Sequence, residues 1–218
     1  MDVKKTISYI LPHIISKGKT ALGQNYEIAY EYGHKVLNSE NANYSFGSLH
    51  QVMQKGITAI LKHIKPTKIL LLGLGGGSAL RIFEKKFSHS YHIKAIEIDT
   101  DIINIALNHF NLNKYKNLET INADASLWIE NASENSFDLI IDDIFMDSII
   151  PDFCFKKEYL ENCSKLLITN GIYFRNTMNL ETSISEKYYN TLSSVFKNIE
   201  LLRVKNLDNS IYLCKNQV

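Results

Sequence analysis

A strand-like run of aliphatic residues that ends in a glycine cluster, and then continues as a helix, constrains the fold of this chain most strongly. Residues 68–83 read KILLLGLGGGSALRIF. Gly73, Gly75, Gly76 and Gly77 lie where the strand pattern gives way to helical spacing. Without Cβ atoms such a loop can adopt positive φ and approach a ligand closely, and the helix after it offers free N–H groups. We interpret the loop as part of a ligand site; a tight packing turn is the alternative.

From Pro66 onward, strand-like and helix-like segments alternate. Continuous aliphatic strands alternating with helices indicate a mainly parallel sheet covered on both faces. A predicted hairpin of residues 199–205 and 210–215 adds an antiparallel last strand. This order resembles the class I methyltransferase variant of the doubly wound, Rossmann-like α/β fold, over residues 46–218. The other predicted strands cover residues 68–74, 92–99, 118–122, 137–143 and 171–176, and the predicted helices cover residues 78–87, 100–110, 125–131, 154–167 and 186–196.

The first 45 residues differ from the rest and predict a small N-terminal β element, residues 1–45, ahead of the Rossmann-like domain. Their short segments are rich in β-branched and aromatic residues, and turn signals at Gly18 and Gly33 separate them. Ser45 is the predicted N-cap of a following helix. The expected strands cover residues 6–15, 26–32 and 35–38, and the helix covers residues 49–64.

Composition excludes several classes of function. The 24 Lys and Arg residues balance the 23 Asp and Glu residues, so no strong attraction to nucleic acid or an anionic membrane is expected. A run of about 18 apolar residues, as a membrane span requires, is absent from the sequence. Cys154, Cys163 and Cys214 are odd in number and lack CxxC spacing, which favours buried free thiols in a reducing compartment. Pro12 interrupts the apolar N-terminal stretch, so we predict mature structure there and a cytoplasmic protein.

Acidic residues follow the second and third strands of the predicted sheet. Glu97, in AIEID, is placed to accept hydrogen bonds from ribose hydroxyls, although a solvated carboxylate is the alternative. Asp124 and Ala125, in NADAS, follow the third strand and are the third candidate binding point after the glycine loop and Glu97. Asp124 there either accepts a hydrogen bond from an adenine amino group or caps a helix. Ser78 stands where a dinucleotide fingerprint has its last glycine, which disfavours NAD. The G-x-G-x-G spacing instead resembles the loop of S-adenosylmethionine-type enzymes, and together with the acids after the next two strands this resemblance implies an adenosyl-sulfonium cofactor.

The fourth strand ends in adjacent acids, Asp142 and Asp143. Successive side chains point to opposite faces of a strand, so only one of the two can aim into a given pocket. We predict that Asp143 is the catalytic residue, which holds and deprotonates an amine nucleophile; a loop-capping aspartate is the alternative. Asp147 and Asp152 lie nearby, but because no His or Cys of ligand spacing accompanies these acids, we predict no metal site.

From residue 68 to about residue 178 the chain resembles the spermidine synthase (polyamine aminopropyltransferase) family. The segments GLGGGSALR, AIEID, ADA, FDLIIDDIFMD and LLITNGI correspond to that family's glycine loop, ribose acid, adenine station, DSSDP motif and final glycine turn. The resemblance implies that Glu97 holds the ribose, Asp124 the adenine, and that Asp143 deprotonates the amine. It also implies S-adenosylmethionine or its decarboxylated form as cofactor, and a homodimer formed through the N-terminal region.

The chain departs from the family mainly in the half that would bind the acceptor. Gly76 replaces the loop aspartate that, in the family, contacts the amine of decarboxylated S-adenosylmethionine. Met146 replaces the second aspartate of DSSDP, and Asp147 follows one residue after that position. Residues 40–53 lack the family's Gln and its Asp-Glu pair. Arg175, in place of the QGE motif, is expected near the site, where its charge would disfavour a cationic polyamine.

The leading hypothesis is therefore a spermidine-synthase-like transferase that moves a methyl or aminopropyl group to an unidentified small-molecule acceptor. Loss of the loop aspartate favours methyl transfer. A non-catalytic nucleotide-binding protein that keeps the fold is the alternative, and a nicotinamide-dependent oxidoreductase is a third reading.

Overall fold

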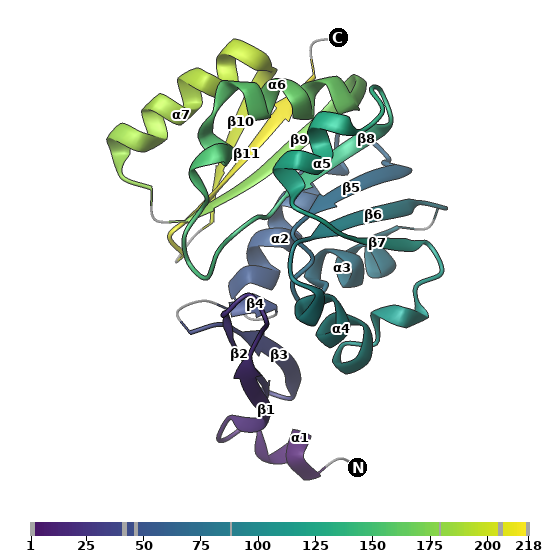
Figure 1. Ribbon diagram of the computed structural model, residues 1–218, viewed down its shortest axis with the longest axis vertical. Coiled ribbons are helices and arrows are strands. Elements are labelled where there is room, and N and C mark those ends of the chain that lie inside the picture. The colour runs from purple at the N-terminus through teal and green to yellow at the C-terminus, as the bar shows by residue number, and fades with distance from the viewer. Residues whose placement is uncertain are drawn as a thin grey trace.

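The computed structural model describes residues 3–40, 43–45, 48–87, 89–178, 180–204 and 207–216. Its largest feature is a seven-stranded sheet in the order β10-β11-β9-β8-β5-β6-β7 (Figure 1). Pairing is parallel from β9 through β7, whereas β11 runs antiparallel to β9 and β10 antiparallel to β11. The predicted α/β fold class is thus confirmed. These strands are β5 (Lys68–Leu72), β6 (His92–Glu97), β7 (Leu118–Asn122), β8 (Phe137–Asp142), β9 (Leu167–Met178), β10 (Lys197–Arg203) and β11 (Asn209–Lys215).

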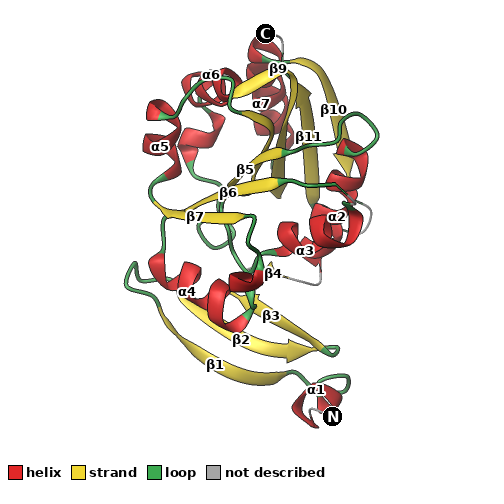
Figure 2. Ribbon diagram, turned by 90° about the vertical axis from the view of Figure 1, so that its right-hand side faces the viewer, coloured by secondary structure: helices red, strands yellow, loops and turns green. Residues whose placement is uncertain are grey.

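Helices cover both faces of this sheet because its strands are apolar on both sides. In β5, Ile69 and Leu71 join the buried cluster under α2, α3 and α4, while Leu70 and Leu72 join the cluster under α5, α6 and α7. Figure 2 shows the sheet between these two layers. The helices are α2 (Ser48–Ile60), α3 (Ser78–Lys86), α4 (Thr100–His109), α5 (Ala125–Asn131), α6 (Lys157–Leu166) and α7 (Thr182–Val195), with short 3-10 turns at Leu112–Lys114 and Asp152–Phe155.

The topology creates a switch point between β5 and β8. From β5 the chain proceeds outward to β6 and β7, and then returns to β8 on the other side. Ligands of open α/β sheets bind beyond the carboxyl ends of the strands at such a point. The loops after β5 and β8 meet there, because Asp143 N donates a 2.9 Å hydrogen bond to Leu72 O.

A second, four-stranded antiparallel sheet forms the N-terminal element, in the order β1-β2-β3-β4. The turn predicted at Gly33 is present between β2 and β3, but Gly18 lies inside β1, where the ring of Tyr26 packs over it. Ser45 belongs to β4 and is not the cap of the next helix. The bounds are α1 (Val3–Ile7), β1 (His13–Lys19), β2 (Asn25–Glu31), β3 (His34–Asn38) and β4 (Asn43–Ser45).

Helix α1 and the turn that follows it replace the first part of the strand that we expected over residues 6–15, and only residues 13–15 of that range lie in a strand, β1. The turn between β2 and β3 holds the end of α1, since Tyr32 N donates to Ser8 O at 2.9 Å and Gly33 N donates to Ser8 Oγ at 3.0 Å. The β-rich composition of the segment is overridden by these tertiary hydrogen bonds.

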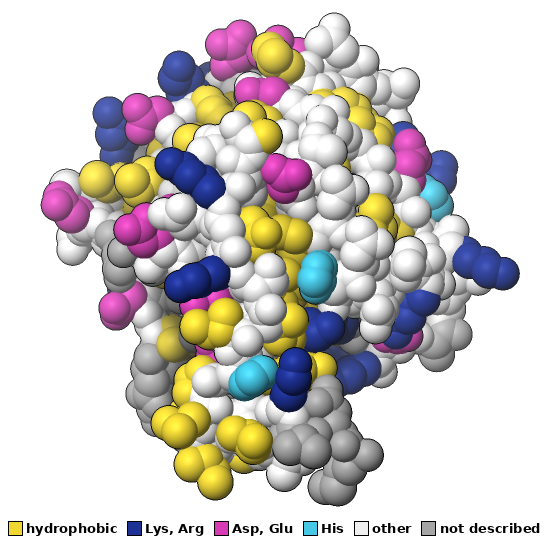
Figure 3. Space-filling view, turned by 60° about the horizontal axis from the view of Figure 1, so that its bottom comes forward, with side chains coloured by type: hydrophobic (Ala, Val, Ile, Leu, Met, Phe, Trp, Pro, Cys, Tyr) yellow, Lys and Arg dark blue, Asp and Glu magenta, His cyan; other side chains and the backbone are white. Residues whose placement is uncertain are grey.

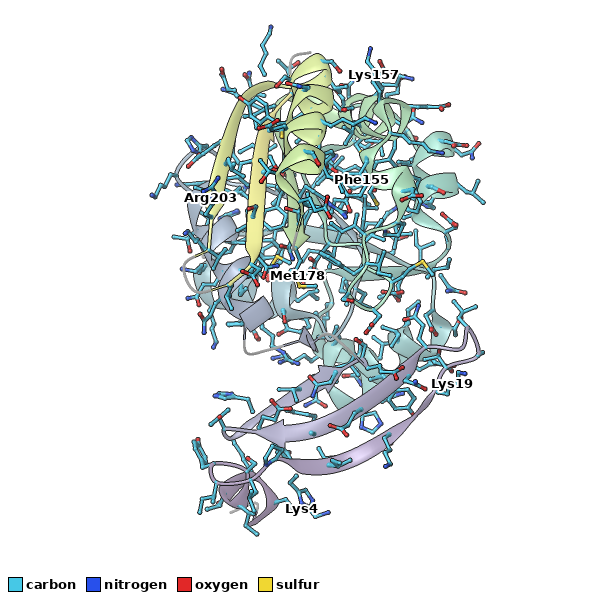
Figure 4. The ribbon with its side chains drawn as sticks, turned by 90° about the vertical axis from the view of Figure 1, so that its left-hand side faces the viewer. Lys4, Lys19, Phe155, Lys157, Met178 and Arg203 are labelled. Atoms are coloured by element: carbon cyan, nitrogen blue, oxygen red, sulfur yellow. The ribbon has the colours of Figure 1, made fainter. Side chains whose placement is uncertain are left out.

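The small sheet packs against the carboxyl edge of the large one. Ala21 N donates to Asp101 Oδ2 at 2.8 Å, and Lys35 Nζ donates to the carbonyl of His109 at 2.8 Å. Figure 4 shows Met178, at the end of β9, beside the junction of the two sheets. Ile28, in β2, shares a buried cluster with residues of α2, so the small sheet also packs on the N-terminal part of the larger domain. The division of the chain into a β element of residues 1–45 and a domain of residues 46–218 stays a prediction.

Two further expectations concern the whole chain. Cys154, Cys163 and Cys214 are buried, and all three are free thiols, as predicted. Among the helices that the structure describes, none combines the length and apolar character needed to cross a membrane.

Candidate cofactor and acceptor site

A cavity of about 570 Å³ lies at the carboxyl ends of β5, β6, β8 and β9. It brings together six of the seven residues that the sequence predicts for the site. The exception is Gly77, which does not line it. The six are Gly73, Gly75, Glu97, Asp124, Ala125 and Asp143.

Gly73 allows the loop after β5 to pack directly on the loop after β8. Its φ is +87°, and a Cβ there would lie 2.7 Å from the carbonyl oxygen of Asp143. Gly73 N also donates a 2.9 Å hydrogen bond to Ile96 O. Only glycine satisfies both the backbone conformation and the close approach, so this residue sets the position of the Asp143 backbone.

Gly77 lies at the start of α3 and is not among the residues that line the cavity. It occupies the N-cap position of α3 with φ +76°, and a Cβ there would lie 2.5 Å from Leu112 Cδ1. The structure therefore gives Gly77 a packing reason to be glycine. A contact between Gly77 and a cofactor stays a prediction.

Glu97 joins the glycine loop to the end of β6. Its Oε2 accepts a hydrogen bond from Leu74 N at 2.9 Å, and its Oε1 accepts one from Asp99 N at 3.2 Å. Burial raises the pKa of Glu97, against the opposing effect of these backbone hydrogen bonds. Each carboxylate oxygen can accept a further hydrogen bond, so the side chain can still hold vicinal hydroxyl groups.

Asp124 combines the two roles that the sequence left open as alternatives. It caps α5, with Oδ1 accepting from Ser126 N at 2.8 Å and from Ser126 Oγ at 2.6 Å, and it lines the cavity as well. Both hydrogen bonds use Oδ1, so within the described part of the chain Oδ2 remains available to a ligand. Ala125 follows as the first residue of α5, and its small side chain also lines the cavity.

Asp143 lines the cavity wall, half-buried, just past the end of β8. Its Oδ1 accepts a 3.0 Å hydrogen bond from Asn176 Nδ2, and Asn209 Nδ2 donates in turn to Asn176 Oδ1 at 3.1 Å. Burial raises the pKa of Asp143 to about 7, although the Asn176 hydrogen bond and the charge of Arg175 oppose the shift. A carboxyl group with such a pKa can exchange a proton near neutral pH.

Asp142 points to the opposite face of the sheet, as strand alternation predicts. It is fully buried, pairs with the guanidinium of Arg175, and accepts hydrogen bonds at Oδ2 from the hydroxyls of Tyr159 (2.9 Å) and Tyr173 (2.7 Å). Arg175 is also fully buried and does not line the cavity. Our expectation that Arg175 disfavours a cationic acceptor was therefore wrong, because Asp142 neutralises its charge away from the cavity.

Several lining residues were missed by the sequence analysis, and four of them come from segments in which it predicted no site residue. Leu22 and Gln24 come from the tip of the β1–β2 hairpin, and Asn176 and Asn209 come from β9 and β11. Strand alternation could have identified Asn176. Arg175 pairs with Asp142 and shares its face of the sheet, so the next residue of each strand, Asn176 and Asp143, lies on the opposite face. Residues 41, 42, 46 and 47, within the departing segment 40–53, lie outside the described residues.

The cavity is acidic at some points and apolar elsewhere. Among its described lining residues there is neither Lys nor Arg. This charge pattern favours a positively charged ligand, such as a sulfonium or an ammonium group. In the described part of the chain, no cluster of three or more His, Cys, Asp or Glu side chains is suited to a metal ion. The lining acids are Glu97, Asp124, Asp143 and Asp147, and the apolar lining residues include Ile144, Phe145, Met146, Pro151, Phe153 and Met178.

The fold defines the class of this protein as a Rossmann-like α/β protein with class I methyltransferase topology. The sequence profile of the Spermine/spermidine synthase domain matches residues 51–205, which is more than half of the chain. The chain belongs to this family, whose members include aminopropyltransferases and methyltransferases. The predicted resemblance is thus confirmed.

Two curated relatives come from these two kinds of transferase. The polyamine aminopropyltransferase of Vibrio vulnificus (strain CMCP6) is 28% identical over 145 residues, 66% of this chain and 46% of the relative. The eEF1A lysine and N-terminal methyltransferase of Xenopus laevis is 27% identical over 156 residues, 67% of this chain and 22% of the relative. The match thus spans less than half of either relative.

Solved structures share the fold at lower identity. A probable spermidine synthase from Corynebacterium glutamicum ATCC 13032 aligns with a TM-score of 0.81 at 17% identity, covering 93% of this chain and 80% of the other. Human methyltransferase-like protein 13, in complex with SAH, aligns with a TM-score of 0.64 at 20% identity, covering 78% of this chain and 80% of the other.

Proposed function

We propose that the cavity binds S-adenosylmethionine or its decarboxylated form, and that the protein transfers an alkyl group from it to a small amine. The observation that carries this proposal is the position of Asp143. A carboxyl group with a pKa of about 7 shares one cavity with Gly73, Glu97 and Asp124, which are suited to holding an adenosyl group. The human structural neighbour in complex with SAH supports an adenosyl-sulfur ligand.

Each acidic residue has a separate role in this proposal. Glu97 accepts hydrogen bonds from the ribose hydroxyls, and Asp124 accepts one from the adenine amino group through Oδ2. The loop at Gly75, which lines the cavity without a side chain, leaves room for the amino-acid end. When bound, the sulfonium supplies an electrophilic carbon with a neutral thioether as leaving group.

Asp143 then prepares the nucleophile. An amine is mostly protonated at neutral pH, with a reference pKa of about 10, and the protonated form has no lone pair to attack with. The ionised carboxylate of Asp143 first holds the ammonium and then accepts its proton, while Asn176 fixes the orientation of the carboxylate. The nitrogen lone pair forms the new bond to carbon as the carbon–sulfur bond breaks and its electrons pass to sulfur.

Methyl transfer is the favoured form of the reaction. Gly76 stands where the family has an aspartate, and the loss of that negative charge removes a repulsion against the carboxylate of ordinary S-adenosylmethionine. Aminopropyl transfer is the second candidate. One feature of the cavity supports aminopropyl transfer. Asp147 adds another acid to described lining residues that include neither Lys nor Arg, and such a lining suits a diamine acceptor.

Calorimetry tests the binding of the donor, and turnover assays test the transfer of the alkyl group. We expect S-adenosylmethionine to bind more tightly than its decarboxylated form, and the reverse order would select aminopropyl transfer. Asp143→Asn should retain donor affinity and lose turnover with a panel of small amines. A wild-type protein that binds either donor but converts no amine, thiol or hydroxyl acceptor would instead be a non-catalytic binding protein.

We also propose a cytoplasmic homodimer formed through the N-terminal element. Figure 3 shows hydrophobic side chains gathered at the lower part of one face of the molecule. Around α1 and β1, Ile10 is 84% exposed, Leu11 65% and Tyr9 61%, an apolar surface that a second copy would cover. Light scattering on the wild type and on an Ile10→Glu, Leu11→Glu variant tests this: a variant with the same mass as the wild type would refute the proposed interface.

A further inference from the structure

The buried Asp142–Arg175 pair lies directly behind the candidate base, on the other face of the sheet. Asp142 and Arg175 are register partners in the parallel pairing of β8 with β9. The next residues along both strands, Asp143 and Asn176, are joined by the 3.0 Å hydrogen bond in the cavity. Two adjacent positions of the same strand pair therefore carry an ion pair on one face and the proposed catalytic hydrogen bond on the other.

The pair also holds the backbone on the far side of Asp143. Arg175 Nη2 donates to the carbonyl of Ile144 at 3.2 Å, and the guanidinium lies 5.6 Å from the ring centre of Phe145. Ile144 and Phe145 both line the cavity. Together with the hydrogen bond from Asp143 N to Leu72 O, these contacts restrain the chain on both sides of the Asp143 side chain.

We infer that Asp142 and Arg175 act as a clamp that positions Asp143 and the adjoining cavity wall without touching the substrate. This inference rests on the proposed function for its catalytic consequences. A buried ion pair is a poor device for stability alone, because apolar replacement of both partners is often neutral or stabilising. The second guanidinium contact, to the Ile144 carbonyl, lets the pair fix the backbone of the residue that follows Asp143.

The two charges of the clamp have opposite effects on the pKa of Asp143. Asp142, on β8, raises the pKa of Asp143, and Arg175, on β9, lowers it. The other polar groups on this side are Asn176, which donates to Asp143, and Asn209, which donates to Asn176. Glu97 and Asp147 are the further acids of the same cavity.

The decisive variant is the double substitution Asp142→Asn, Arg175→Met, measured in the full-length protein. We expect it to fold and to keep donor affinity, because the amide oxygen still accepts from Tyr159 and Tyr173, while kcat falls on the order of 10- to 100-fold through misplacement of Asp143. The amide NH₂ in place of Oδ1 has no acceptor there, so the unfolding midpoint should fall modestly. A double variant with wild-type kcat would overturn the inference. Ser164→Ala is the matched control: it removes a buried 2.6 Å hydrogen bond to Asn216, away from the cavity, and should leave kcat unchanged.

A second variant keeps the inference testable if the double variant fails to fold. Arg175→Lys keeps a positive charge opposite Asp142 but loses the guanidinium fork that also reaches the Ile144 carbonyl. If the clamp positions Asp143, the carboxylate should move away from Asn176, and its pKa should rise because it loses that hydrogen bond. A ¹³C NMR titration of the Asp143 carboxyl, assigned with Asp143→Asn, measures this without turnover, and an unchanged midpoint would overturn the clamp. A wild-type protein that lacks transfer activity would instead refute the proposed function, and the titration would still decide the inference.

Discussion

Asn176 Nδ2 donates a 3.0 Å hydrogen bond to Asp143 Oδ1, and this contact joins the ends of β8 and β9 at the cavity wall. Asn209 accounts for the orientation of the amide, because it donates to the Asn176 oxygen and leaves the NH₂ group directed at the carboxylate. A hydrogen bond to the ionised form lowers a carboxyl pKa, whereas burial raises it. Asn176 therefore keeps part of the Asp143 population ionised at neutral pH.

Replacement of Asn176 by leucine should raise the pKa of Asp143, because the hydrogen bond that favours the carboxylate is lost. The acidic limb of the pH dependence of kcat/KM should then move to higher pH. Thr177→Val is the matched control: Thr177 is the next residue of β9, and its hydroxyl bonds to Ser210 O. We expect the control to leave the pH profile in place. An unshifted limb in Asn176→Leu would contradict the role of this hydrogen bond.

The large sheet was predictable from the sequence because its signals are local and mutually consistent. Unbroken aliphatic runs such as residues 69–72 are buried on both faces, and glycines or acids mark their ends. The N-terminal element was harder to predict. Helix α1 has five residues and is held at Ser8 by the β2–β3 turn, a contact between segments far apart in the sequence.

The site was predictable where one residue follows one strand, as at Glu97, Asp124 and Asp143. It was not predictable where partners come from elsewhere. Gln24 reaches the cavity from the β1–β2 hairpin, and nothing in its own segment indicates that. Arg175 was misplaced because an exposed cation and a paired, buried one look alike in a sequence; only the register with Asp142 distinguishes them.

Substitutions at Asp124 should separate its capping role from its ligand role. Asparagine caps helices about as well as aspartate, so Asp124→Asn should keep the melting temperature. It places an NH₂ group where Oδ2 would face the adenine amino group, and the affinity for S-adenosylhomocysteine should fall by about tenfold. Asp124→Ala should also lose about 1 kcal/mol of stability through the lost cap. Calorimetry and thermal unfolding measure the two effects, and wild-type affinity in Asp124→Asn would exclude adenine recognition by this residue.

Gly73→Ala should destabilise the fold by more than the strain of its backbone. Gly73 (φ +87°) and Gly23 (φ +84°) have nearly the same φ, but a Cβ at Gly73 meets the Asp143 carbonyl at 2.7 Å, whereas one at Gly23 meets only Lys19 Cε at 3.6 Å. Gly23→Ala, the control, should cost roughly 1 kcal/mol, and Gly73→Ala about 1–3 kcal/mol more. Urea unfolding compares the two, and equal losses would mean that the loops after β5 and β8 are not in contact.

The raised pKa of Asp143 should make stability depend on pH. The group titrates at about 7 in the folded protein against an ordinary value of 3.8, so the folded state holds the proton more tightly. Its contribution to stability is present at low pH and is lost as pH rises through about 7. Asp143→Asn removes this loss, so the variant should become more stable than the wild type with rising pH. Melting temperatures measured from pH 4 to pH 8 check this, and a constant difference would show that the pKa is not raised.

A crystal structure with S-adenosylhomocysteine bound tests the central claim most directly. The account predicts the ribose hydroxyls on Glu97, the adenine amino group at Asp124 Oδ2, and the sulfur in the same cavity as Asp143. A nucleoside bound elsewhere, or one bound with Glu97 and Asp124 turned away from it, would contradict the account.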